Sequence, residues 1–163
     1  MSIGSTPTMS VVDDLTGVTE VRPGNYAFFD AFQASIGSCK LDDAAFSVLT
    51  SVIGHYPSDG RLVLDAGALA LSKDAGAPHS DGSTRYGVVC DLDSRPIADL
   101  QLVSLSQEHG IVHGPPSAIA PHGVGTRLRI IANHSCLAAA CFDSYHVARS
   151  HEVTTTWRPT RGW

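Results

Sequence analysis

Lysine is scarce in this chain, and charged residues of both signs are few. The 163 residues include 11 lysines and arginines against 16 acidic residues, and the formal net charge is −5. The basic residues are scattered singly, so no basic stripe could neutralise the phosphates of a nucleic acid. We therefore expect no nucleic-acid binding.

Long apolar runs are also missing. No run approaches the roughly 20 residues that a membrane-spanning helix needs, and the start from Met1 to Met9 has neither the basic nor the apolar region of a secretory signal. We expect a cytoplasmic protein that does not enter the membrane. Its four cysteines are widely spaced in a chain long enough to bury a core without cross-links, which favours reduced thiols or metal ligands over disulfides.

Short stretches with strand composition recur along the chain, separated by turns. Leu100–Ser106 alternates apolar and polar residues with the period of two that a half-buried strand requires. A helical turn is expected over Leu41–Ala45 and a loop over residues 75–83. Many short strands joined by turns indicate a mostly β protein, an antiparallel β-sandwich or barrel. Strands are predicted over Val18–Phe32, Phe46–Ile53, Arg61–Gly67, Tyr86–Asp91, Leu100–Ser106, Arg127–Ala132, Tyr145–Val147 and Val153–Trp157.

The beginning of the chain differs from the rest. It opens on the turn-forming residues Gly4 to Thr8 and continues with one strand that is entered or broken at Pro23-Gly24. We expect residues 1–33 to be the end of a preceding domain and residues 34–163 to form the β domain.

His134 and Cys136 form the first candidate site. On an extended chain, residues two apart project to the same face, so an imidazole and a thiolate could reach one ion. This borderline-soft pair suits Zn²⁺ better than Mg²⁺ or Ca²⁺, and two protein ligands leave positions open for water and substrate. The alternative is a hydrogen-bonded histidine near the core beside a small buried cysteine. Among the other histidines, His109 is the best candidate for a third ligand.

A second candidate site combines small residues with an arginine. Glycine and hydroxyl side chains let a phosphate approach the backbone closely, and a guanidinium supplies fixed donors. The alternative is two ordinary turns. The residues concerned are Gly4, Ser5, Thr6, Arg22, Gly24, Asn25 and Tyr26.

Five short motifs, taken in order, resemble the C-terminal portion of the D-serine dehydratase and D-threonine aldolase family. The resemblance spans nearly the whole chain, and the order of the motifs is more specific than any one of them. They are Gly4-Ser5-Thr6-Pro7-Thr8, the segment 19–26, Asp65-Ala66-Gly67, the segment 105–110 and Asn133-His134-Ser135-Cys136.

The resemblance implies an alanine-racemase-like, TIM-type barrel that holds pyridoxal 5'-phosphate on a lysine, followed by a β domain with a metal site. This chain would then comprise the last barrel strands, within residues 1–33, and the metal-binding β domain over residues 34–163. Gly4, Ser5, Thr6, Gly24 and Asn25 would approach the cofactor phosphate. Arg22 would face the pyridine nitrogen, and Tyr26 would line the cofactor pocket.

The resemblance also implies a reaction and partners. His134 and Cys136 would bind Zn²⁺, or another divalent metal such as Mn²⁺. The intact enzyme would be a lyase acting on D-β-hydroxy amino acids, by dehydration of D-serine to pyruvate and ammonia or by aldol cleavage of D-threonine, and it would be a homodimer. Departures from the family pattern are Ala68-Leu69, Gln107 and Ala132.

The two lysines, Lys40 and Lys73, do not lie in the family's cofactor-lysine context. Schiff-base chemistry needs such a lysine, so we expect the chain alone to be inactive without the N-terminal half of the barrel. The alternative is a non-catalytic metal-binding or interaction domain, or the remnant of a split gene.

Overall fold

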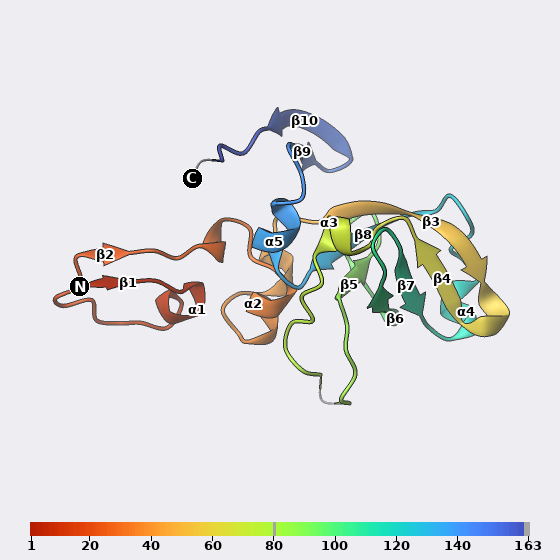
Figure 1. Ribbon diagram of the computed structural model, residues 1–163, viewed down its shortest axis with the longest axis horizontal. Helices are drawn as coiled ribbons and strands as arrows, with labels where there is room; N and C mark the ends of the chain where they lie inside the picture. Colours follow the sequence, from red (N-terminus) through yellow and green to blue (C-terminus); the bar gives the residue numbers. More distant parts are fainter. Residues whose placement is uncertain (80, 162–163) are drawn as a thin grey trace.

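A closed barrel of six antiparallel strands forms the body of the molecule (Figure 1). The computed structural model describes residues 1–79 and 81–161. Neighbouring strands around the barrel follow the order β3-β4-β7-β6-β5-β8. Their bounds are Val48–Tyr56 for β3, Arg61–Leu64 for β4, Gly87–Cys90 for β5, Pro96–Leu105 for β6, Gly110–His113 for β7 and Arg127–Ala132 for β8. The prediction of a mostly β, antiparallel protein is confirmed, and closure selects the barrel over the sandwich.

Alternation of apolar and polar residues explains which side of each strand is buried. In β3, Val48 and Val52 point into the core while Leu49 and Ile53 remain exposed. Strands with one buried face place every second residue inside. The resulting core comprises Val48, Val52, Leu62, Leu64, Ala66, Leu71, Val89, Leu100, Leu102, Leu105, Val112, Ile119, Leu128 and Ile130.

The turn from β3 to β4 is built as its sequence predicts. Pro57–Asp59 forms a single 3₁₀ turn (η3), and Gly60 follows with a φ of +61°. A Cβ at Gly60 would lie 2.6 Å from the carbonyl oxygen of Gly114. Glycine is therefore required there both by backbone conformation and by space.

The first 21 residues form an arm at one end of the molecule, on the left in Figure 1. Strands β1 (Ser2–Ile3) and β2 (Glu20–Val21) pair in parallel, and the short helix α1 (Thr6–Met9) lies between them in sequence. Parallel pairing is what the strands of a TIM-type barrel require.

The single strand expected over Val18–Phe32 is wrong beyond Val21. After Pro23-Gly24 the chain forms a 3₁₀ turn, η1 (Asn25–Ala27), and then helix α2 (Ala31–Ser35). The carboxylate of Asp30 caps α2 by accepting a hydrogen bond from the N–H of Gln33 at 2.8 Å, the usual role of an aspartate at a helix N-terminus. The aromatic residues favour a strand, but Pro23-Gly24 ends the extended chain and the Asp30 cap starts a helix.

An aromatic cluster connects this region to the β domain. The ring of Phe28 lies 5.6 Å from that of Phe46 and 5.7 Å from that of Tyr145, measured between centroids. Phe46 also meets Phe142. The boundary between residues 33 and 34 remains a prediction, and these contacts cross it.

The remaining elements are short. Helix α4 (Pro116–Ile119) packs near η3, and α3 (Ala68–Leu71) near α5 (Ser135–Ala139). The 3₁₀ turn η2 (Leu41–Asp43) agrees with the predicted helical turn. Strands β9 (Tyr145–Arg149) and β10 (Glu152–Trp157) form a hairpin outside the barrel, at the top of Figure 1. Among the described residues, no helix is long and apolar enough to cross a membrane.

Candidate functional site

His134 and Cys136 lie where β8 ends and α5 begins. His134 is the N-cap of α5, with φ −131° and ψ +97°, and Cys136 is the second residue of the helix. The premise that both lie on an extended chain is therefore wrong, because the strand stops at Ala132. Both side chains still reach solvent on either side of the buried Ser135, since His134 is half-buried and Cys136 exposed.

Asn133 fixes the position of this segment. Its side chain is buried, and Nδ2 donates to the carbonyl oxygens of Asp74 at 3.0 Å and Arg85 at 2.7 Å. One amide group thereby holds both ends of the intervening loop against the residue that precedes His134. This use of both N–H donors satisfies the buried amide.

Asp74 contacts His134 directly. Nδ1 of His134 lies 3.0 Å from Oδ2 of Asp74, and Oδ1 of Asp74 accepts from the N–H of Gly76 at 2.8 Å. The Gly76 hydrogen bond and then the His134 side chain lower the pKa of Asp74, so the group is a carboxylate at neutral pH. The sequence offered no signal for this pairing, because 60 residues separate the two positions.

The thiol of Cys136 is less acidic than usual. Partial burial of its sulfur and the negative charge of Asp30 raise its pKa, because both disfavour the thiolate. A metal ion bound there would have to displace the thiol proton.

A buried hydrogen-bond network lies beneath the candidate site. Oδ2 of Asp30 accepts from the N–H of Ser135 at 2.9 Å and from the side-chain amide of Asn25, and Ser135 Oγ donates to Asn25 Oδ1 at 2.6 Å. Asp30 and Ser135 are each 1% exposed. This network joins residues 25–30 to the middle of the His134–Cys136 segment, and sequence reasoning had given no role to Asp30 or Ser135.

The residues predicted for the cofactor come together in two neighbouring turns. The Asn25 N–H donates to Thr6 Oγ1 at 2.9 Å, and the Arg22 N–H donates to the carbonyl oxygen of Ile3 at 2.8 Å. A Cβ at Gly4 would lie 3.1 Å from the carbonyl oxygen of Arg22. Gly4, Ser5 and Thr6 therefore lie beside the segment from Arg22 to Asn25.

Three side chains of this group have distinct surroundings. Arg22 Nε donates to Ser2 Oγ at 2.9 Å and lies near Glu20. Ser5 has a φ of +145°, a conformation that L residues rarely adopt. Tyr26 is 61% exposed.

His109 lies in the tight turn between β6 and β7, where its N–H lies 3.3 Å from Ser106 Oγ and its carbonyl accepts from the Ser106 N–H. Within residues 1–79 and 81–161, no three histidine, cysteine, aspartate or glutamate side chains are grouped to hold a metal. His109 therefore does not complete a three-ligand set with His134 and Cys136.

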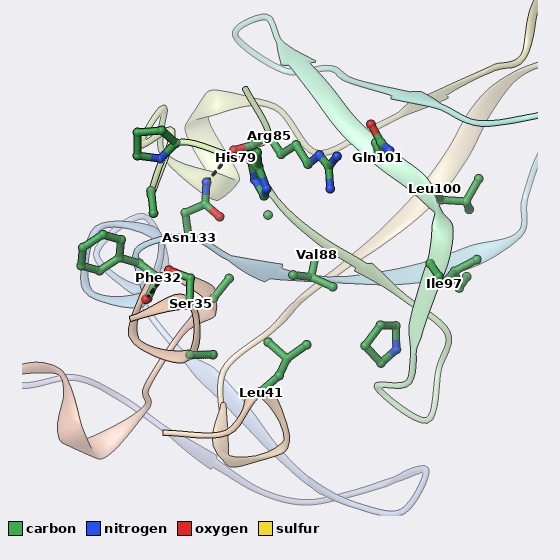
Figure 2. Close-up of a pocket in the computed structure, with 17 residues that line it drawn as sticks. Phe32, Ser35, Leu41, His79, Arg85, Val88, Ile97, Leu100, Gln101 and Asn133 are labelled. Atoms are coloured by element: carbon green, nitrogen blue, oxygen red, sulfur yellow. Dashed lines mark hydrogen bonds between the residues drawn. The ribbon is translucent and has the colours of Figure 1, made fainter. Parts of the chain in front are cut away.

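A cavity of about 400 Å³ lies next to the candidate site. Figure 2 shows His79, Arg85 and Asn133 at one end, and Val88, Ile97 and Leu100 further along. Its walls come from α2, β5, β6 and the loop before β5. Apolar residues dominate the lining, and Asn133 connects the cavity to the His134 segment.

Comparison with known families identifies the domain. Residues 45–148 match the family model described as "Putative serine dehydratase domain". The chain belongs to the serine dehydratase domain family. The resemblance drawn from the five motifs is thereby confirmed, and the match falls within the serine dehydratase domain predicted over residues 34–163.

Two relatives of this serine dehydratase domain are longer enzymes. Over its full length the chain is 42% identical to D-threo-3-hydroxyaspartate dehydratase of Delftia sp. strain HT23 and 37% identical to D-serine dehydratase of Dictyostelium discoideum. It spans only 44% and 43% of their lengths. The solved Delftia enzyme matches 99% of the chain with a TM-score of 0.87, over 44% of its own length. Two further solved structures that match the chain are D-threo-3-hydroxyaspartate dehydratase variants, one histidine-to-alanine and one cysteine-to-alanine in a metal-free form.

One relative is short. The uncharacterised protein Rv1414 of Mycobacterium tuberculosis is 33% identical over 132 residues, which are 79% of this chain and 92% of that protein. The serine dehydratase domain therefore also occurs in a protein little longer than the matched segment.

Proposed function

We propose that this chain is the metal-binding C-terminal part of a pyridoxal-phosphate-dependent dehydratase acting on D-β-hydroxy amino acids such as D-serine. His134 and Cys136 would hold the metal. Gly4, Ser5, Thr6, Arg22, Gly24, Asn25 and Tyr26 would form one side of the cofactor site. The proposal rests on two curated relatives, 42% and 37% identical to this chain, that are both dehydratases.

The main support for the metal site is the spacing of its histidine and cysteine, which a relative shares. The histidine and cysteine replaced in the solved D-threo-3-hydroxyaspartate dehydratase variants are two positions apart, and the cysteine variant was solved in a metal-free form. His134 and Cys136 have the same spacing, and the Asp74 contact at Nδ1 leaves Nε2 of His134 for a ligand bond. A nitrogen and a sulfur donor suit Zn²⁺, with Mn²⁺ as the next candidate.

The metal would supply Lewis-acid polarisation of the substrate hydroxyl, and the cofactor an electron sink. This chain's own residues would position the groups that bind the metal and the cofactor. Asp30 fixes the backbone at Ser135, so His134 and Cys136 start α5 at a defined point. The same carboxylate binds Asn25, so the proposed metal and cofactor residues are held by one buried group.

The proposed partner is a lysine-bearing α/β barrel half, as another part of the same polypeptide or as a separate chain. Neither Lys40 nor Lys73 lies among the candidate cofactor residues. Strands β1 and β2 have two residues each, and within the described part of the chain each pairs with the other alone. So small a parallel sheet is not stable by itself and normally has both faces covered. We also propose that the intact enzyme is a homodimer located in the cytoplasm. The described cysteines are all free thiols, which is compatible with a reducing compartment.

Metal analysis tests the metal site. The purified chain, loaded with Zn²⁺ and desalted, should retain about one equivalent, as expected for a single ion site. His134→Ala and Cys136→Ala should each lose it, whereas the matched control His109→Ala should keep it. Retention of zinc by His134→Ala and Cys136→Ala would contradict the proposed metal site.

Complementation tests the reaction. We would co-express the chain with the portion of the Delftia enzyme that it does not match, and supply pyridoxal phosphate, Zn²⁺ and D-serine. Pyruvate should form only when both parts are present and co-elute, and His134→Ala should abolish it. Glycine and acetaldehyde from D-threonine would indicate aldol cleavage instead. Pyruvate from the chain alone would contradict the need for a barrel.

A second candidate is a non-catalytic metal-binding or interaction domain. The Mycobacterium protein favours it, because 92% of that protein matches this chain, which leaves little room for a lysine-bearing barrel. Zinc retention without any complex or activity in the co-expression would support this candidate.

A further inference from the structure

We propose that Asp74 is the positioning residue for His134: its carboxylate holds the proton on Nδ1, so that Nε2 is the nitrogen presented to a metal ion. The inference rests on the proposed metal site. It concerns a residue outside the motifs that identify the family.

The contact is short and direct. Oδ2 of Asp74 lies 3.0 Å from Nδ1 of His134. A carboxylate can only accept, so a neutral imidazole in this contact carries its proton on Nδ1 and its lone pair on Nε2. In known metal sites, a carboxylate on the second ring nitrogen orients the ring and makes the ligating nitrogen more basic.

Asp74 is itself held from several sides. Its other oxygen accepts from the Gly76 N–H at 2.8 Å, and its carbonyl accepts from Asn133 Nδ2 at 3.0 Å. Gly76 has a φ of +66°, and a Cβ there would lie 2.9 Å from the side chain of Asn133. The loop therefore turns tightly against Asn133, the residue that precedes His134. This turn places the Asp74 carboxylate beside the His134 imidazole.

Stability alone does not account for the pair. The side chains of His134 and Asp74 are 41% and 35% exposed, and such exposed pairs contribute little to folding. Asn133 already anchors the loop through two hydrogen bonds of its own. Asp74 additionally determines which nitrogen of the His134 imidazole carries the proton and which has a free lone pair.

The variant Asp74→Asn separates the two roles. Its amide oxygen can still accept from the Gly76 N–H and keep the loop in place. Its NH₂ group then faces Nδ1 and donates to it, which moves the imidazole proton to Nε2, the nitrogen that the metal needs. Asp74→Asn should therefore impair metal binding although it preserves the turn. Asp74→Ala should release the ring and leave its tautomer unconstrained.

The control is Asp81→Asn. Asp81 also accepts from a backbone N–H two residues on, that of Ser83 at 2.9 Å, but its charged partner is Arg85, with no bond to His134. This substitution changes charge and turn chemistry in the same loop without touching the imidazole.

Two measurements on the purified chain test the inference. Competition with a chromophoric chelator should show Zn²⁺ affinity reduced about 10- to 100-fold in Asp74→Asn and Asp74→Ala, and within twofold of the parent in Asp81→Asn. Nitrogen-15 NMR of the metal-free protein should place the His134 proton on Nδ1 in the parent and on Nε2 in Asp74→Asn. Amide spectra should show all three variants folded.

Each outcome has a definite meaning. A parent protein with its proton on Nε2, or an Asp74→Asn variant with unchanged tautomer and zinc affinity, would overturn the inference. A parent with the Nδ1 proton that binds no zinc would instead overturn the proposed function and leave the Asp74 contact established.

Discussion

The six-stranded barrel and the region around Asp30 are stabilised by different kinds of contact. The barrel buries a continuous apolar core, and its strands pair around a closed circle. Around Asp30, elements of three to five residues meet through one buried carboxylate and its polar partners. The barrel is thus stabilised mainly by apolar packing and strand pairing, whereas the candidate site depends on a few directional hydrogen bonds.

The largest effect should follow from a cavity in the barrel. Leu102 is fully buried, and Leu102→Ala should lower the free energy of unfolding by about 2–5 kcal/mol through lost packing. Urea denaturation measures the change. The matched control Leu49→Ala removes an exposed side chain and should change it by less than about 0.5 kcal/mol. Equal losses of unfolding free energy in Leu102→Ala and Leu49→Ala would show that the buried barrel core is not the main source of stability.

An intermediate effect is expected at Asp30. Asp30→Ala leaves the N–H groups of Gln33 and Ser135 without their acceptor, which should cost about 1–3 kcal/mol. Hydrogen exchange should accelerate at Ser135 and remain slow at Leu62 in β4. If exchange instead accelerates uniformly, the two regions unfold as one unit and the contrast between them fails.

Cys90 gives the barrel a distinctive response to alkali. Burial raises the pKa of its thiol to about 11 from 9.0. The folded state then binds this proton more tightly than the unfolded state, so its contribution to stability is full below pH 9 and declines as the pH rises toward 11. Denaturation at pH 8 and pH 10 should show a smaller decline for Cys90→Ala than for the parent. An identical decline in both would exclude Cys90 as the cause.

The smallest effect should come from the β9–β10 hairpin. Every residue of β10 is exposed, including Val153 at 61%. Val153→Ser should change the free energy of unfolding by less than about 0.5 kcal/mol. A larger loss in urea denaturation would show that the hairpin supports the barrel.

Sequence patterns predicted the barrel well because its strands obey local rules. Alternation located β6, and the Pro57-Ser58-Asp59-Gly60 turn separated β3 from β4. The region from Asn25 to Phe32 was mispredicted as strand, because its aromatic residues have strand preference while the Asp30 cap imposes a helix.

The candidate site was only partly predictable for a related reason. His134 and Cys136 were found through their spacing, but the end of β8 at Ala132 placed them on a helix start. Asp30 lies 105 residues before Ser135, and Asp74 lies 60 residues before His134. Contacts of such separation depend on barrel closure, which local patterns do not encode.

The double hydrogen bond of Asn133 has a consequence for engineering. Because one side chain fastens the backbone at both Asp74 and Arg85, the positions of the loop ends do not depend on the length of the loop between them. Gly82 lies in this loop, where a Cβ would meet nothing within 4 Å although its φ of +72° favours glycine, so a fluorophore or an affinity tag inserted beside a retained Gly82 should leave His134 in place.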